Sequence, residues 1–230
     1  MLEPRAIVTD IEGTTSSLSF VKDALFPYSR EKLPDFVRSR ADEPRIRAVI
    51  EEARDVLADR SAPLDAVILK LLEWLDSDQK LTPLKTLQGY IWEQGFTRGE
   101  LEGHVYEDAV QALRAWNARG IQLYVYSSGS VASQKLVFEH TAFGDLRSLF
   151  AGYFDTTLGG KLEKSSYSAI ANAIDRPPSD LLFLSDNLKE LDAARDAGVK
   201  TLWLNRYGSP QNRAGHGEVT SFAAIDLRRV

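Results

Sequence analysis

Four short apolar runs, each rich in β-branched or aromatic residues, constrain the fold of this chain most. They cover residues 6–9, 121–126, 181–184 and 199–204. Runs of this length and composition are typical of buried strands. The first ends at Asp10, the second is followed by SSGS and the third by SDN. Polar groups beyond the carboxyl ends of strands are typical of the ligand site of an open α/β sheet.

Segments with helical periodicity separate these runs. Val110, Leu113 and Trp116 recur at helical spacing, and Gly120 follows them as a typical helix terminator. A second helical segment covers residues 167–174. Strands that alternate with helices predict βαβ units, so we expect an α/β fold with a mostly parallel, Rossmann-like sheet. Its ligand site should lie beyond the carboxyl ends of the strands.

The pattern changes between residues 17 and 102, because no strand-like run appears there. Apolar residues recur at helical spacing instead, in one stripe over residues 46–57 and a second over residues 64–75. A chain of 230 residues is long enough for a core domain with a smaller inserted one. We therefore expect a core domain of residues 1–16 and 103–230, with an all-helical domain of residues 17–102 inserted into it.

Composition excludes several classes of function. The chain has no cysteine, which excludes disulfides, thiolate nucleophiles and cysteine-ligated metals. Its formal net charge is -5, and 28 basic side chains are interspersed with 33 acidic ones, so nucleic acid has no basic stripe to follow. A small anionic molecule remains a suitable partner, because a lysine and a metal ion can reverse the field inside a cleft.

Targeting and membrane signals are missing from the sequence. No apolar stretch approaches the roughly 18 residues that a membrane span requires. The first predicted strand begins at residue 6, which leaves no room for a signal peptide before it. We expect a cytoplasmic protein with no membrane association, and we expect a monomer.

Two carboxylates, Asp10 and Glu12, stand two residues apart directly after the first predicted strand. This spacing projects both to one side while Ile11 points away, as a nucleophile and a proton donor require. Gly13 permits a sharp exit from the strand. The alternative is a surface turn with a helix cap, and after a buried strand the two interpretations are nearly equal.

Two further segments offer phosphate ligands. Ser127 and Ser128 follow the second strand, where hydroxyl and backbone N–H groups can hold phosphate oxygens, although an ordinary Ser-Gly turn explains them as well. Lys161 follows a Gly-Gly turn, and its ammonium group can reach a phosphate as a point charge. Lys164 competes for this role, and a solvated surface lysine is the alternative for each.

A third carboxylate, Asp186, follows the third predicted strand. Together with Asp10 it offers oxygen ligands to a hard divalent cation. Magnesium fits this set better than zinc, because the sequence has no HExxH pattern and no Cys/His cluster. The histidines lie far apart without a motif, and we interpret them as structural or surface residues: His104, His140 and His216.

The order of these groups resembles the four motifs of the haloacid dehalogenase superfamily. The motif residues are Asp10 with Glu12, then Ser127, then Lys161, then Asp186. Each motif is weak alone, but their joint occurrence in this order after predicted strands and turns is specific. The resemblance implies a phosphatase that forms an aspartyl-phosphate on its first aspartate. It also implies a helical cap inserted after the first motif, which is where the helical segment lies.

A closer resemblance extends over both core and insert. The segments DIEGTT, SFVKDALFPY, LQGYIWEQGF and YSSGSVASQKL are similar to the enolase-phosphatases of methionine salvage, also called acireductone synthases. Those enzymes, which serve amino-acid biosynthesis, enolise 2,3-diketo-5-methylthiopentyl-1-phosphate and hydrolyse its phosphate to give acireductone. Most other phosphatases of the superfamily have Asp where this chain has Glu12, which favours the narrower family.

The resemblance implies a role for each motif residue. Asp10 corresponds to the nucleophile and a ligand of Mg²⁺, Glu12 to an acid/base residue that contacts the metal, and Asp186 to a metal ligand. Lys161 is preferred to Lys164 as the catalytic and phosphate-binding lysine, because it stands six positions before a helical tyrosine, as in many relatives.

Other expectations from the resemblance concern the phosphate and the substrate tail. Ser127 and Ser128 correspond to residues that contact phosphate or substrate. Many relatives carry a second acid directly after the last motif aspartate, where this chain has Asn187, with Glu190 and Asp192 further along. Four aromatic residues of the insert either receive the methylthio group or form the insert's own core: Phe20, Phe26, Tyr28 and Trp92.

Two other functions use the same residues. One is a generic capped phosphatase that acts on another small phosphomonoester, and enolisation of the diketone under magnesium distinguishes it. The other is a phospho-acceptor signalling module, which also combines Asp, Ser/Thr and Lys on an α/β sheet. The long helical segment directly after Asp10 argues against such a module.

Overall fold

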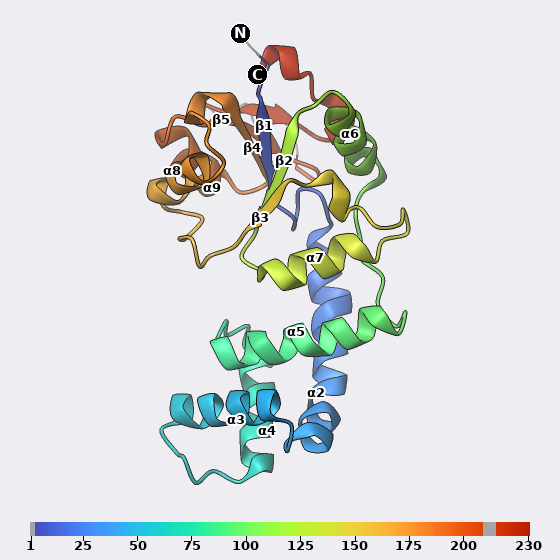
Figure 1. Cartoon of the computed structure of the whole chain (residues 1–230), viewed down its shortest axis with the longest axis vertical. Helices are drawn as coiled ribbons and strands as arrows, with labels where there is room; N and C mark the ends of the chain where they lie inside the picture. Colours follow the sequence, from blue (N-terminus) through green and yellow to red (C-terminus); the bar gives the residue numbers. More distant parts are fainter. Residues whose placement is uncertain (1–2, 209–214) are drawn as a thin grey trace. The chain divides into compact units, whose positions relative to one another are not determined.

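The computed structural model describes residues 3–208 and 215–230. Its contacts divide the chain into two compact units (Figure 1). The core unit comprises Met1–Leu18 and Gly103–Val230, and the helical unit comprises Ser19–Glu102. Because the chain leaves and re-enters the core unit, the helical unit is an insertion.

A six-stranded parallel sheet forms the centre of the core unit, in the order β3-β2-β1-β4-β5-β6. The strands are β1 (Ala6–Thr9), β2 (Gln122–Tyr126), β3 (Gly152–Phe154), β4 (Leu181–Ser185), β5 (Lys200–Leu204) and β6 (Gly217–Val219). From β1 the chain adds β2 and β3 on one side, then returns to add β4, β5 and β6 on the other. The strand order therefore reverses between β1 and β4, and open parallel sheets bind ligands beyond the carboxyl ends of strands at such a point.

The sheet contains the four predicted strands to within one residue at each end, so those predictions are confirmed. The strands β3 and β6, which form the two edges of the sheet, were not predicted from the sequence. Both are three residues long, begin at a glycine and contain no buried residue. Edge strands of this length bury too little to impose an apolar pattern on the sequence.

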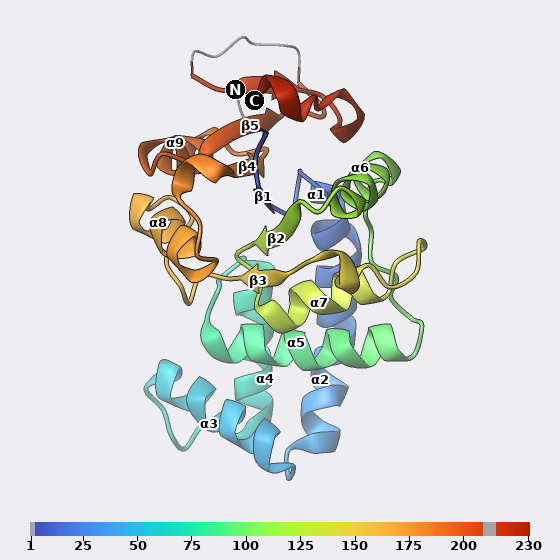
Figure 2. The same cartoon turned by 45° about the horizontal axis from the view of Figure 1, so that its top comes forward.

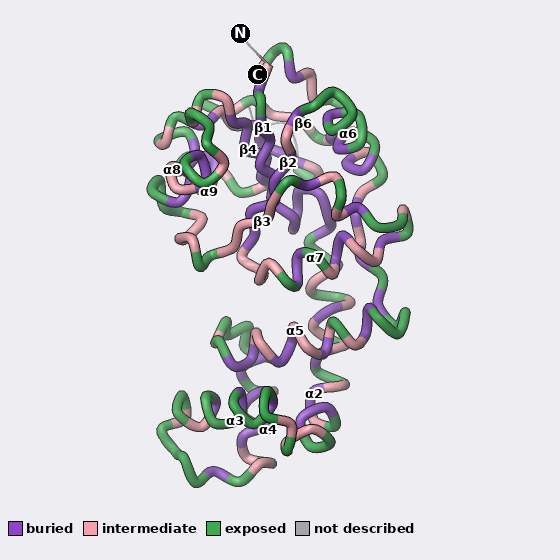
Figure 3. Tube along the Cα trace, viewed as in Figure 1, coloured by how far each residue is buried: buried purple, intermediate pink, exposed green. Residues whose placement is uncertain are grey.

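Helices cover both faces of the sheet (Figure 2). On one face lie α6 (Glu107–Ala118) and α7 (Val131–Glu139), and on the other lie α8 (Lys164–Ala173) and α9 (Leu188–Asp196). Ile7 of β1 packs into the first core, whereas Ala6 and Val8 pack into the second, as the pleat of a strand requires. The central strands are therefore buried along most of their length (Figure 3).

The helical unit, whose residues are all described, contains helices and no strand. After α1 (Leu18–Phe20) and a π-helical turn (Val21–Leu25) come α2 (Phe26–Arg40), α3 (Pro44–Leu57), α4 (Leu64–Asp76) and α5 (Thr82–Thr97). The two predicted stripes lie on α3 and α4 and pack into one core with α2 and α5. Val56, near the end of the first stripe, departs from the pattern and is 47% exposed.

No helix in the described part of the chain is both long enough and apolar enough to span a membrane.

Candidate active site

The predicted motif residues lie beyond the carboxyl ends of the central strands of the sheet. Asp10 directly follows β1, which lies between β2 and β4 in parallel register with both. Ser127 directly follows β2, and Asp186 directly follows β4. Because parallel strands point the same way, these three residues follow the carboxyl ends of neighbouring strands, beside the point where the strand order reverses.

Local hydrogen bonds fix Asp10 in the turn after β1. Its side chain is buried, and its Oδ1 accepts the backbone N–H of Ile11 at 2.8 Å. Its backbone carbonyl accepts the Thr15 hydroxyl at 3.1 Å. The carboxylate is therefore held in one orientation before any ligand binds.

Gly13 brings this turn into contact with the end of β4. Its φ of 72° lies in the left-handed region, and a Cβ atom at this position would lie 2.1 Å from Oδ2 of Asp186. The Thr14 hydroxyl accepts the backbone N–H of Asp186 at 3.1 Å. Only glycine allows this approach without displacing the Asp186 carboxylate.

Lys161 joins two buried carboxylates. Its Nζ lies 2.7 Å from Oδ1 of Asp10 and 2.8 Å from Oε2 of Glu190, and its side chain is 9% exposed. Burial lowers the pKa of this ammonium group, but the charges and hydrogen bonds of the two carboxylates outweigh burial and raise it. Tyr167 donates a hydrogen bond to the Lys161 carbonyl at 2.7 Å, whereas Lys164 is exposed at the start of α8.

Glu190 is a site residue to which the sequence analysis gave no role. It lies in the first turn of α9 and is buried, and its Oε2 accepts the Ser185 hydroxyl at 3.1 Å. Burial first, and then the charge of Asp10, raises its pKa. The sequence did contain a signal for Glu190, which comes four residues after Asp186. Because Asn187 caps α9, this spacing places Glu190 in the first turn of the helix, close to Asp186. Asp192, the other acid considered, is exposed.

Asp186 is largely buried beside two other carboxylates, those of Asp10 and Glu190. Burial first, and then the charges of Asp10 and Glu190, raises its pKa to about 7. Three carboxylates with a single ammonium group favour the binding of a cation, and carboxylate oxygens suit Mg²⁺. Across the described residues, however, no three acidic or histidine side chains form a ready metal site. Asp10 and Asp186 offer carboxylate oxygens to the ion, and metal ligation by these two residues and by the partly exposed Glu12 stays a prediction.

Hydrogen bonds hold the turn after β2. Ser127 is 4% exposed, and its hydroxyl accepts the backbone N–H of Gly129 at 3.3 Å. Gln134 donates to the Gly129 carbonyl at 2.8 Å, and Ser130 caps α7. Ser128 is half-buried in the same turn. The turn is thus rigid, while the contact of Ser127 and Ser128 with phosphate stays a prediction.

Arg206 donates a hydrogen bond to the turn that follows Asp10, and it was not predicted from the sequence. Its Nε donates to the Thr14 carbonyl at 2.8 Å, and its guanidinium lies 3.2 Å from Asp108 and 3.8 Å from the centroid of the Tyr106 ring. Its side chain is 8% exposed. No sequence signal pointed to it, because its partners are distant along the chain.

His104 has a structural position, as predicted. Its Nδ1 accepts the backbone N–H of Ser17 at 3.1 Å, and the Ser16 hydroxyl lies 3.3 Å from the same nitrogen. Burial first, and then the charge of Arg206, lowers its pKa. A neutral ring suits this contact, because a protonated Nδ1 cannot accept the Ser17 hydrogen bond.

The aromatic residues considered for the substrate tail lie in the helical unit. Phe20 is buried and Tyr28 packs against the helical core. Trp92 donates to the Leu25 carbonyl at 3.1 Å, within the π-helical turn. These contacts give each of the three a packing role, and a role in substrate binding stays a prediction for them and for Phe26.

Comparisons with known proteins agree with this site. The model of the haloacid dehalogenase-like hydrolases matches residues 4–198. An enolase-phosphatase E1 of Pseudomonas aeruginosa is 56% identical over 221 residues, covering 96% of this chain and 97% of that protein. An enolase-phosphatase E1 of Methylococcus capsulatus is 53% identical, with coverage of 96% and 97%.

Solved structures give the same result for the fold. The crystal structure of the UTR4 protein from Saccharomyces cerevisiae matches with a TM-score of 0.83 and 32% identity, covering 96% of this chain and 100% of that one. CbbY from Rhodobacter sphaeroides, crystallised with phosphate, matches with a TM-score of 0.59 and 17% identity, covering 96% of each chain. The second likeness concerns the fold alone.

Proposed function

The chain belongs to the haloacid dehalogenase-like hydrolases and, among them, to the enolase-phosphatases, and on this basis we propose how its residues act. It enolises and dephosphorylates 2,3-diketo-5-methylthiopentyl-1-phosphate to acireductone, a step of methionine salvage. The observation that supports the residue roles best is the 2.7 Å contact between the Lys161 ammonium group and the buried carboxylate of Asp10.

We assign the attack on phosphorus to Oδ2 of Asp10, because Oδ1 already meets the Ile11 N–H and Lys161. The new O–P bond forms as the bond to the substrate oxygen breaks, which gives an aspartyl-phosphate. Lys161 holds the Asp10 carboxylate through their 2.7 Å contact and neutralises phosphoryl oxygens. Phosphomonoester hydrolysis requires on the order of 20 kcal/mol of transition-state stabilisation, which comes mainly from positioning and charge neutralisation.

Glu12 serves as the acid and base in this scheme. It protonates the leaving oxygen of the substrate and later takes a proton from the water that hydrolyses the aspartyl-phosphate. Glu12 stands two residues after Asp10 in the same short turn, and this position beside the nucleophile supports the role. Ser127 and Ser128 are proposed to bind phosphate oxygens or substrate from the turn after β2.

We propose Mg²⁺ as the cofactor, held by Asp10 and Asp186, with Glu12 as a further predicted contact. The ion supplies a Lewis acid for the phosphoryl oxygens and for the diketone. Asp186 supports this assignment, because burial first, and then the negative charges of Asp10 and Glu190, raise its pKa. We further propose that residues 17–102 act as a cap domain, and that the protein is a cytoplasmic monomer.

One assay tests the substrate and the cofactor together. The full chain is mixed with the diketone phosphate, with and without Mg²⁺, while phosphate release and the absorbance of the enol are followed. We expect both signals with Mg²⁺ and neither without it. Phosphate release without an enol signal would identify a generic phosphatase and contradict the assignment.

A second experiment tests the nucleophile. Rapid acid quenching during turnover should trap one phosphoryl group on Asp10, located by peptide mass spectrometry. The Asp10→Asn variant should remain folded, trap no phosphate and show no hydrolysis. A trapped phosphoryl group on another residue would overturn the assignment.

A further inference from the structure

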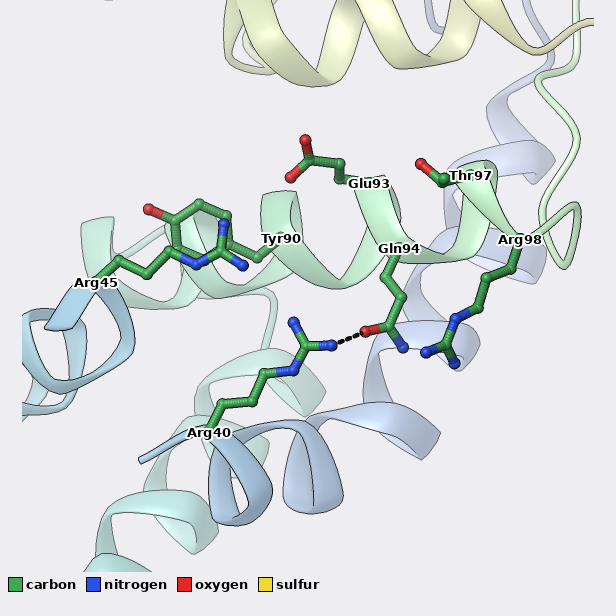
Figure 4. A pocket seen from close by; sticks show the side chains of 7 residues that line it. All are labelled: Arg40, Arg45, Tyr90, Glu93, Gln94, Thr97 and Arg98. Atoms are coloured by element: carbon green, nitrogen blue, oxygen red, sulfur yellow. Dashed lines mark hydrogen bonds between the residues drawn. The ribbon is translucent and has the colours of Figure 1, made fainter. Parts of the chain in front are cut away.

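A small pocket in the helical unit has three arginines in its wall (Figure 4). Its volume is about 300 Å³. The lining residues are Arg40, Arg45, Tyr90, Glu93, Gln94, Thr97 and Arg98. All belong to one unit, so the pocket is defined without reference to the phosphatase motifs.

Three helices contribute to the pocket. Tyr90 and Gln94 stand four residues apart on α5, and Arg98 follows four residues later as the C-cap of that helix, so the three form one row. Arg40 is the last residue of α2, and Arg45 lies in the first turn of α3. Figure 4 shows Arg40 reaching toward Gln94, with Arg98 beside the same glutamine.

Two of the guanidinium groups are already held in place. Arg40 lies 4.4 Å from the centroid of the Phe36 ring and donates a hydrogen bond to Oε1 of Gln94. Arg45 lies 4.9 Å from the centroid of the Tyr90 ring. A ligand that meets these groups loses less affinity to side-chain ordering than one that must immobilise free arginines.

The positive charge of the pocket is only loosely balanced. Glu43 serves two arginines, at 3.9 Å from Arg40 and 3.4 Å from Arg45. Glu100 lies 3.9 Å from Arg98. These separations exceed hydrogen-bond length for most of the pairs, so the guanidinium N–H groups remain suited to a stronger acceptor.

Other charged side chains of the helical unit pair more closely or point elsewhere. Arg30 and Asp76 form a close pair at 2.7 Å in the same unit, so tight pairing is available elsewhere on this surface. Glu93, the lining carboxylate, points to the other side of α5 from Gln94 in Figure 4. On a chain of net charge -5, the pocket brings three guanidinium groups together, although the carboxylates of Glu43 and Glu100 partly balance their charge.

Arg45 lies where the dipole of a helix acts on its charge. It stands in the first turn of α3, which runs for 14 residues, and there the helix dipole disfavours a cation. The same dipole favours an anion, as does the arginine itself. Glu43, the N-cap residue of α3, already places one carboxylate 3.4 Å from Arg45, and a bound anion would add to its effect.

We propose that this pocket is an anion site that binds a phosphate group, either free phosphate or the phosphate of a small ester. Guanidinium groups recognise tetrahedral phosphate through paired N–H donors, which lysines cannot provide. Its lining residues all belong to the helical unit, and none of them has a role in the proposed catalysis.

Calorimetric titration of the full chain in EDTA, at constant ionic strength, tests the proposal. The probes are inorganic phosphate and glycerol 3-phosphate, each added to the wild type and to a variant carrying Arg40→Gln and Arg98→Gln. We expect the pocket variant to bind at least one probe about tenfold more weakly or worse, because each lost bond involves a charged group. The probe that binds identifies the source of the phosphate.

A matched variant controls for general electrostatics. Arg38 lies on α2 and Arg47 on α3, both outside the pocket, so Arg38→Gln with Arg47→Gln removes the same charge from the helical unit. We expect this control to bind within about twofold of the wild type, because exposed charges act weakly at a distance in salt. Equal loss in both variants, unchanged binding in the pocket variant, or no binding of either probe to the wild type would overturn the proposal. Should the pocket variant not fold, Arg45→Gln is compared with Arg47→Gln, which removes one charge from the same helix outside the pocket.

Discussion

Replacing Gly13 by alanine tests the contact between the Asp10 turn and Asp186. The new Cβ atom would lie 2.1 Å from Oδ2 and 2.5 Å from Cγ of Asp186. Both are atoms of a side chain, so the carboxylate can rotate away while the backbone stays in place. The fold should therefore survive, but the carboxylate should leave its position beside Asp10.

The variant has two separable costs. The φ of 72° at Gly13 is left-handed, which costs an alanine about 1–2 kcal/mol of stability. Displacing the Asp186 carboxylate should weaken Mg²⁺ binding by about 10- to 100-fold, the range found when the support of a metal ligand is removed. The first cost concerns folding, and the second concerns the site.

Gly120 provides a matched control for the first cost. Its φ is 80°, and among the described residues nothing lies within 4 Å of a Cβ atom built there. Gly120→Ala should therefore show the same loss of stability as Gly13→Ala without any loss of Mg²⁺ binding.

Urea unfolding measures the stability of the two variants, and the shift of the unfolding temperature with Mg²⁺ concentration measures metal affinity. Turnover of a phosphomonoester at saturating and limiting Mg²⁺ gives a third readout. If Gly13→Ala bound Mg²⁺ and turned over like Gly120→Ala, the Asp186 carboxylate would not be the ligand that we infer.

Three further changes test other parts of the structure. Glu12→Asp retracts the acid by one methylene and should lower kcat by about 10² or more, and an unchanged kcat would remove Glu12 from the mechanism. The lowered pKa of His104 means that the unfolded chain binds its proton more tightly, so the unfolding free energy should fall as the pH drops below the usual value of 6.5. A variant with His104→Asn should lose that part of the pH dependence, and an identical profile would contradict the assignment. Arg206→Met leaves Asp108 without its ion pair and should lower the unfolding free energy by about 3 kcal/mol, as measured in urea. The exposed Arg147 is its control: Arg147→Met should cost about 0.5 kcal/mol or less, and equal losses would refute the burial argument.

Much of the fold could be predicted from local pattern alone. The central strands are buried on both faces, so their sequences are continuously apolar, and the helices of the insert have an apolar stripe because one side faces a core. The edge strands β3 and β6 could not be found this way, because they lack a buried face. Val56 belongs to the predicted stripe but is exposed near the end of α3, where Leu57 packs against the core instead.

The sequence by itself determined which groups follow the strand ends, because a strand's polar successor is adjacent to it in the chain. It therefore indicated Asp10 and Asp186 and, through the spacing to a helical tyrosine, favoured Lys161. Only the tertiary structure decided which other residues join the site. Glu190 contacts Lys161, and Arg206 donates to a carbonyl that is 192 positions away in the sequence. Such contacts depend on the packing of whole strands and helices, and no local spacing records them.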